Sequence, residues 1–126
     1  MLVIRHNPEA LGIPAGEYSH VSRVKANELL FIAGQLSAGD NMAAQCDGVF
    51  NAIHAALVSA GANWDNIVQF TTYVTGSEHI PEFKRWRQEH FPVMFGADNY
   101  PPNTLLVITE LARKECLIEV QAVAAV

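Results

Sequence analysis

Two amphipathic helical stretches, each lying between strand-like runs, constrain the fold of this chain more than any other feature of its sequence. The first has apolar residues at spacings of three and four over about residues 42–60, which places them on one side of a helix. Gly61 follows, where a helix C-terminus favours a left-handed residue. The second begins near Ser77, which can cap a helix, and is expected to end by about His90 because Pro92 disfavours helical angles at the residue before it.

The strand-like runs either alternate polar and apolar side chains or are rich in β-branched and aromatic residues. Residues 16–24 and 28–35 are separated by a short polar turn, so we expect an antiparallel hairpin. Residues 66–75 predict a central strand, and residues 104–111 and 117–124 predict a second hairpin. The connection of strand, helix and strand favours parallel pairing. The sequence therefore predicts an α+β fold in which a mixed sheet carries both helices on one face.

The length and composition of the chain predict one domain that hides part of its surface in an oligomer. At 126 residues, the chain is long enough for a real core but too short for two domains, so we expect a single domain over residues 1–126. Half of the residues are hydrophobic and only 17% are charged. Surface charge this sparse favours packing against other subunits.

The negative net charge argues against nucleic acid as a partner, and the lack of a signal peptide or membrane-spanning pattern argues against membranes. The formal net charge is −5, whereas phosphate binding depends on clustered Lys and Arg. The one basic cluster, FKRWRQEH at residues 83–90, is interpreted as a solvated helix face. No stretch has the pattern of a signal peptide or the length of a membrane span. Cys46 and Cys116 have no metal or redox spacing, so reduced thiols and a cytoplasmic location are expected.

The histidines do not form a recognisable metal motif. They are scattered at His6, His20, His54, His79 and His90, with no HxH, HxxH or HExxH spacing. A metal site built from sequence neighbours is therefore not expected. His20 lies in a strand-like run beside Tyr18, but placement on the surface or in the core is favoured over a ligand role.

A carboxylate interrupts the most apolar run of the chain, KECLIEVQAVAAV at residues 114–126. Because side chains alternate along a strand, Glu119 shares one face with Leu117, Gln121 and Val123. Either this face meets water, or Glu119 points into a pocket and handles a proton or a water molecule. If both helices cover the other face, this half-apolar face is better suited to packing against a second subunit, with its polar positions lining a cleft.

Several segments together resemble the reactive intermediate deaminase (Rid) family, also called YjgF-like or liver perchloric-acid-soluble protein. In chain order they are GEYSHV, LLFIAGQLS, AAQCDGVFNAIHAALVSAGA, NIVQFTTYVT, YPPNT and LIEVQAVA. The resemblance implies a chorismate-mutase-like α+β fold, a homotrimer with inward-facing sheets, and one ligand cleft at each subunit boundary. It also implies hydrolysis of small enamines and imines such as 2-aminoacrylate, with release of ammonia and without a cofactor.

The resemblance further implies which residues line the cleft. The pocket tyrosine of the family corresponds to Tyr18, its strand glycine and glutamine to Gly34 and Gln35, and the carboxylate that orients the attacking water to Glu119. Thr104 is expected to hydrogen-bond the substrate. A carboxylate suits imine hydrolysis, because a water must be placed beside the carbon and a proton must be moved.

Three cleft positions depart from the family's pattern. Asn103 stands where deaminating members carry an arginine that holds the substrate carboxylate, Ala33 replaces a serine, and Leu105 replaces a cysteine found in many members. An amide carries no charge and cannot reproduce the bidentate contact of a guanidinium. Losing such a contact commonly costs a few kcal/mol. We therefore expect a preference for substrates without a free α-carboxylate.

Arg87 is a cation that could compensate for the missing arginine. It lies on the apolar stripe of the second helix, with Ile80, Phe83 and Phe91, where a guanidinium is costly unless paired. Two interpretations remain open: Arg87 binds substrate in the cleft, or it bridges to a carboxylate at the subunit boundary.

Three functions follow from the sequence. The first is a trimeric enzyme that hydrolyses a small imine or enamine. The second is a protein that binds a metabolite without converting it, or that acts through interactions in a stress response. The third, endoribonuclease activity, has little physical support in an acidic chain without a catalytic histidine pair or a metal motif.

Overall fold

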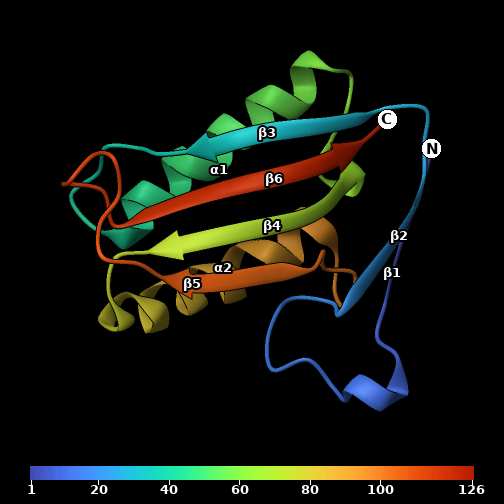
Figure 1. Ribbon diagram of the computed structural model, residues 1–126, viewed down its shortest axis with the longest axis horizontal. Helices are drawn as coiled ribbons and strands as arrows, with labels where there is room; N and C mark the ends of the chain where they lie inside the picture. The colour runs from blue at the N-terminus through green and yellow to red at the C-terminus, as the bar shows by residue number, and fades with distance from the viewer.

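The computed structural model describes all 126 residues, with two α-helices and six strands (Figure 1). The strands are β1 (Leu2–His6), β2 (Val21–Lys25), β3 (Leu29–Gln35), β4 (Ile67–Val74), β5 (Asn103–Val107) and β6 (Ile118–Ala125). The helices are α1 (Met42–Ser59) and α2 (Ile80–Phe95), and short 3-10 turns cover Glu9–Leu11, Trp64–Asn66 and Ser77–His79.

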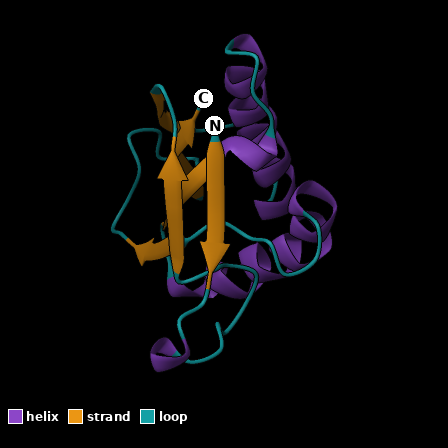
Figure 2. Cartoon of the chain, turned by 90° about the vertical axis from the view of Figure 1, so that its right-hand side faces the viewer, coloured by secondary structure: helices purple, strands orange, loops and turns teal.

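The predicted mixed sheet with both helices on one face is confirmed. Strands β3, β6, β4 and β5 lie in that order, with β4 and β5 parallel and the other neighbours antiparallel. The parallel pair is the one that α2 connects, as the pattern of strand, helix and strand predicts. Figure 2 shows both helices on the same side of the strands. The face of the sheet away from the helices is left without a covering layer.

The first predicted hairpin is wrong. β2 pairs with β1, which was not predicted, and these two strands form a separate sheet beside the main one (Figure 1). Arg5 explains much of this placement, because its guanidinium donates hydrogen bonds to the carbonyls of Trp64 and Ile67, at 3.2 and 2.8 Å. Ser22 Oγ also donates to the carbonyl of Val68, at 2.7 Å. These contacts hold the β1–β2 pair at the start of β4 and away from β3.

The second predicted hairpin is wrong as well. β5 ends at Val107, and β6 is not its neighbour but lies between β3 and β4. The reason lies in the side chains of β6, since Ile118, Val120, Ala122 and Ala124 are all at most 2% exposed. A strand this apolar is buried best in the middle of the sheet, where it has neighbours on both sides.

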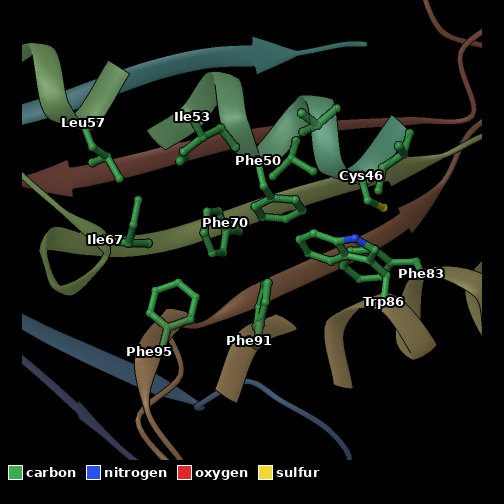
Figure 3. Packing of buried hydrophobic residues seen from close by; sticks show 14 of the residues in the cluster. Cys46, Phe50, Ile53, Leu57, Ile67, Phe70, Phe83, Trp86, Phe91 and Phe95 are labelled. Carbon is green, nitrogen blue, oxygen red and sulfur yellow. The ribbon is translucent and has the colours of Figure 1, made fainter. Parts of the chain in front are cut away.

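The core lies between the two helices and the sheet (Figure 3). The predicted stripe of α1 is buried there, and Gly61 adopts the expected left-handed conformation with φ of 72°. Phe50 is central to the core, with ring centroids 5.6, 4.7 and 5.7 Å from those of Phe70, Trp86 and Phe91. Aromatic contacts of this kind fix the distance between α2 and the sheet.

The predicted end of the second helix at about His90 is wrong. α2 continues through Pro92 to Phe95, and Gly96 ends it with φ of 79°. Phe91 and Phe95 are 0% and 5% exposed, so stopping the helix earlier would remove two aromatic rings from the core. Their burial outweighs the local cost of proline, which removes one backbone hydrogen-bond donor.

Burial of Cys46 in the α1 stripe predicts a loss of stability at alkaline pH. Burial, together with the negative charges of Asp47 and Glu82, raises the pKa of the Cys46 thiol from 9.0 to about 12. The folded state therefore favours the protonated thiol, a contribution that is complete below pH 9 and is lost as the pH rises toward 12. We expect the free energy of unfolding, measured by urea denaturation, to fall over this range less steeply in Cys46→Ala than in the wild type. Equal slopes in the two proteins would contradict this account.

Candidate functional site

Glu119 lies on the face of the sheet that no helix covers. The alternation predicted for β6 is confirmed, because Ile118 and Val120 on either side of Glu119 are fully buried against the helical layer. Gln121 and Val123 share the face of Glu119. The carboxylate is half-buried although no helix covers it, so a neighbouring strand must shield it.

The backbone of β3 covers the Glu119 carboxylate. The pairing of β3 with β6 shifts register between Ile32 and Gln35, which places Ala33 and Gly34 in an irregular stretch beside Glu119. A Cβ atom added to Gly34 would lie 2.6 Å from Glu119 Oε2, so the carboxylate lies directly against the glycine. Gln35 Nε2 donates to the carbonyl of Ala33 at 3.0 Å. The sequence-predicted residues Ala33, Gly34, Gln35 and Glu119 therefore lie together.

The rest of this face combines polar and apolar side chains. Tyr73 lies opposite Glu119 in the β4–β6 register, and its hydroxyl donates to Gln121 Oε1 at 3.2 Å. Thr104 shares the face through its pairing with β4, although it does not pair with Glu119. Phe31 and Leu106 also lie here and are 78% and 41% exposed. A face with such exposed apolar side chains is typical of a surface that packs against another protein chain.

Asn103 lies on the opposite face of the sheet from Glu119, so these two predicted cleft residues do not lie side by side within one chain. Its Oδ1 accepts a hydrogen bond of 2.9 Å from the hydroxyl of Thr72, a buried residue of β4 that faces the helices. Its Nδ2 is buried and donates no hydrogen bond. Leu105, two residues along β5, packs against the same core. Because successive side chains of a strand point to opposite faces, Asn103 and Thr104 of one chain lie on different faces of the sheet. The two side chains therefore do not contact one substrate from the same face.

Arg87 is buried between α2 and the loop before β2, where the backbone of Gly16 lies against its guanidinium. It is 5% exposed, so the interpretation of residues 83–90 as a solvated helix face does not hold for this side chain. Its Nε donates to Glu17 Oε1 at 3.4 Å, and its guanidinium lies 5.4 Å from the ring centroid of Phe83 and 5.8 Å from that of Tyr18. Burial lowers the pKa of Arg87, and the charge of Glu17 opposes this shift. The carboxylate that Arg87 requires thus comes from its own chain.

The loop that carries Glu17 approaches Arg87 closely because of a glycine. A Cβ atom on Gly16 would lie 2.5 Å from Arg87 Nη2, so a larger residue would displace one of the two. Tyr18 is fixed on the same loop, where its hydroxyl accepts a 3.2 Å hydrogen bond from the backbone N–H of Ala15. Ser19 N–H donates to the carbonyl of Pro101, which ties the loop to the segment before β5. The loop therefore brings Tyr18 and Arg87 together.

A hollow of about 250 Å³ lies beside this loop. Its lining includes Asn7, Pro14, Gly16, Tyr18, Asp98 and Tyr100. Asp98 adds a negative charge to the hollow, and no arginine or lysine lines it. The lining of this hollow therefore favours an uncharged or cationic ligand over an anion.

Comparisons with known proteins place these features in a family. Residues 9–126 match the family model described as Endoribonuclease L-PSP (Ribonuc_L-PSP). The chain belongs to this family. The RutC family protein YjgH of Escherichia coli (strain K12) is 27% identical over 122 residues, which cover 86% of this chain and 90% of the relative.

Two solved structures of the same family are similar to this chain in both sequence and fold. The structure of YyfB from Yersinia pestis, a protein of unknown function in the conserved Rid family, is 26% identical with a TM-score of 0.86 over all of both chains. Rv2704 from Mycobacterium tuberculosis, of the YjgF/YER057c/UK114 family, is 28% identical with a TM-score of 0.67, over 99% of this chain and 100% of its own. The predicted membership of the Rid family is confirmed.

Two further observations on this Rid-family chain concern metal binding and membrane-spanning helices. No group of three or more His, Cys, Asp or Glu side chains lies close enough together to hold a metal ion. Neither helix combines the length and the apolar character that crossing a membrane requires.

Sequence reasoning missed Glu17 and Thr72, the partners of Arg87 and Asn103. For Glu17 a signal was present, because an arginine predicted on an apolar stripe needs a carboxylate, and Glu17 precedes the predicted pocket residue Tyr18. For Thr72 no signal was present, since threonine is an ordinary residue of a central strand.

Proposed function

We propose that this Rid-family protein hydrolyses a small enamine or imine in a cleft between two copies of the chain, with Glu119 orienting the attacking water. The observation that carries the proposal is the position of Glu119, whose carboxylate lies against Gly34 on a sheet face that also exposes Phe31 and Leu106. A second copy packed on this face would cover the apolar side chains and leave the carboxylate in a cleft.

The opposite placement of Glu119 and Asn103 supports a cleft made by two copies. β5 is an edge strand, and Asn103 and Leu105 are both half-buried, so the edge of one copy can be reached by the uncovered face of another. In the proposed homotrimer with inward-facing sheets, each cleft takes Glu119 from one copy and the β5 edge with Tyr18 and Asn103 from its neighbour. No contact within a single chain can assemble this set.

The proposed reaction needs one proton-transfer group and one water molecule. The water oxygen attacks the imine carbon, the electron pair of the C=N bond moves to nitrogen, and Glu119 accepts a proton from the water and delivers it to the nitrogen. The carbinolamine that forms then loses ammonia and becomes the carbonyl product. An enamine is first protonated at carbon and loses a proton from nitrogen, a tautomerisation that converts it into the imine. The sum is imine plus water giving carbonyl compound plus ammonia, without a cofactor.

The charges around the proposed cleft predict its substrate preference. Asn103 carries no charge, and Glu17 neutralises Arg87. We expect kcat/KM for ammonia release to be about tenfold or more higher on 2-iminopropanamide than on 2-iminopropanoate, because a missing charge-assisted contact costs at least ~1.4 kcal/mol. The two imines differ only in an amide or a carboxylate, so each serves as the control for the other. Equal or higher efficiency on the carboxylate would contradict this preference.

Two other functions remain as alternatives to hydrolysis. The first is that the cleft binds a metabolite without converting it, or that the protein acts through interactions with other proteins. Either role would use the same surface and would not need proton transfer by Glu119. The family description also names an endoribonuclease, but a chain with a net charge of −5 is poorly suited to holding RNA phosphates.

Both cysteines are free thiols, which suits the cytoplasmic location that we propose.

A further inference from the structure

Arg87 is a fixed cation inside the fold. Its side chain is 6% exposed, and the rings of Phe83 and Tyr18 lie on its flanks. A guanidinium in such surroundings requires an anion, because its burial without one is costly. The anion that it has in this structure is Glu17.

Arg87 and Glu17 form fewer hydrogen bonds than a guanidinium and a carboxylate can form with each other. A carboxylate can accept two parallel hydrogen bonds from a guanidinium, whereas here one bond of 3.4 Å joins Nε to Oε1. The two terminal nitrogens, Nη1 and Nη2, donate no hydrogen bond within the protein. Arg87 therefore retains unused donors toward an anion.

The two partners also differ in how they are held. Arg87 projects from the buried side of α2, while Glu17 belongs to the loop before β2 and its side chain is 21% exposed. Moving Glu17 into water therefore disturbs little of the core, whereas moving Arg87 would disturb it.

We propose that Glu17 occupies the position on Arg87 that the carboxylate of a small substrate would otherwise take, and thereby determines the preference of the site for uncharged substrates. The assignment deepens the proposed function and rests on it for the class of substrate. An anionic ligand must first displace Glu17, whereas an amide of the same shape need not. Removing the charge of Glu17 converts the site into one for small monocarboxylates.

The test is the affinity of Glu17→Gln for pyruvate and for pyruvamide, the carbonyl products of the two imines, measured by isothermal titration calorimetry. The glutamine oxygen can still accept the hydrogen bond from Arg87 Nε, so the loop keeps its anchor. We expect pyruvate to bind at least tenfold more tightly to Glu17→Gln than to the wild type, and pyruvamide to change by less than threefold. Unchanged pyruvate affinity, or an equal gain for both ligands, overturns the proposal.

Three more variants separate the local effect from general ones. Glu9→Gln removes the same charge at an exposed position of the same N-terminal segment, and it is expected to leave pyruvate affinity unchanged. In the double variant Glu17→Gln with Arg87→Gln, the gain in pyruvate affinity should disappear; a gain that persists overturns the role of Arg87. Glu17→Ser provides the same comparison if the glutamine variant fails to fold.

Failure of this inference can be told apart from failure of the proposed hydrolysis. A gain in pyruvate affinity without ammonia release from either imine supports the Arg87 site and contradicts the enzyme. Ammonia release that depends on Glu119, combined with unchanged pyruvate affinity in Glu17→Gln, supports the enzyme and contradicts the role of Glu17.

Discussion

Replacing Glu119 by Gln is expected to lower kcat/KM for ammonia release from 2-iminopropanamide by about 10²- to 10⁴-fold, the usual range for a lost general acid or base. The amide has nearly the shape of the carboxylate, so it fits against Gly34 in the same way. It cannot accept a proton from the attacking water. Pyruvamide affinity should therefore stay within about threefold of the wild-type value, because binding requires no proton transfer.

The matched control for this variant is Glu28→Gln. Glu28 is exposed and precedes β3, at the end of that strand opposite to Gly34, so its replacement removes the same charge without touching the carboxylate site. We expect wild-type activity from it. If Glu119→Gln lowers affinity and leaves the rate of ammonia release unaltered, the cleft binds metabolites and Glu119 is not its proton-transfer group.

Replacing Gly34 by Ala is expected to lower activity by about 10²-fold through displacement of the Glu119 carboxylate. The new methyl group would lie 2.6, 2.7 and 2.9 Å from Oε2, Cδ and Cγ of Glu119, which are distances too short for any of these atoms to remain in place. A displacement of about 1 Å of a catalytic group is enough for a loss of this size. Ammonia release and urea denaturation of the same protein would measure the effects on rate and on stability.

The Glu119→Ala background supplies the control for Gly34→Ala. Once the side chain of Glu119 is shortened, the methyl group at position 34 meets no obstacle from it, so the cost in stability of Gly34→Ala should shrink. The difference between the two backgrounds gives the coupling between the residues. A Gly34→Ala protein with wild-type activity would show that contact with β3 does not position the carboxylate.

Patterns that depend on local periodicity could be predicted from the sequence. The stripe of α1 and the alternation along β6 both follow from neighbours within a few residues, so the buried faces of these elements are as predicted. The Glu119 side of the site was accordingly placed on the correct face. Family membership also followed, because several motifs in the correct order are more specific than any one of them.

Strand partners could not be predicted in the same way. The local pattern of β2 and β3 suits a hairpin, but the contacts of Arg5 and Ser22 with the start of β4 decide the pairing, and these lie more than 40 residues away in sequence. The face of Asn103 was equally hidden. β5 is apolar at successive positions, so its own sequence does not show which side faces the helices, and only its register with β4 settles it.

The central claim is that Glu119 of one copy and Asn103 of a neighbouring copy meet around the same small molecule. A crystal structure of the assembled protein with pyruvamide tests it most directly. We predict pyruvamide at a boundary between two copies, with the Glu119 carboxylate next to its carbonyl carbon and Asn103 of the other copy within hydrogen-bond distance. Glu119 surrounded by bulk solvent, with pyruvamide bound elsewhere or not at all, would contradict the account.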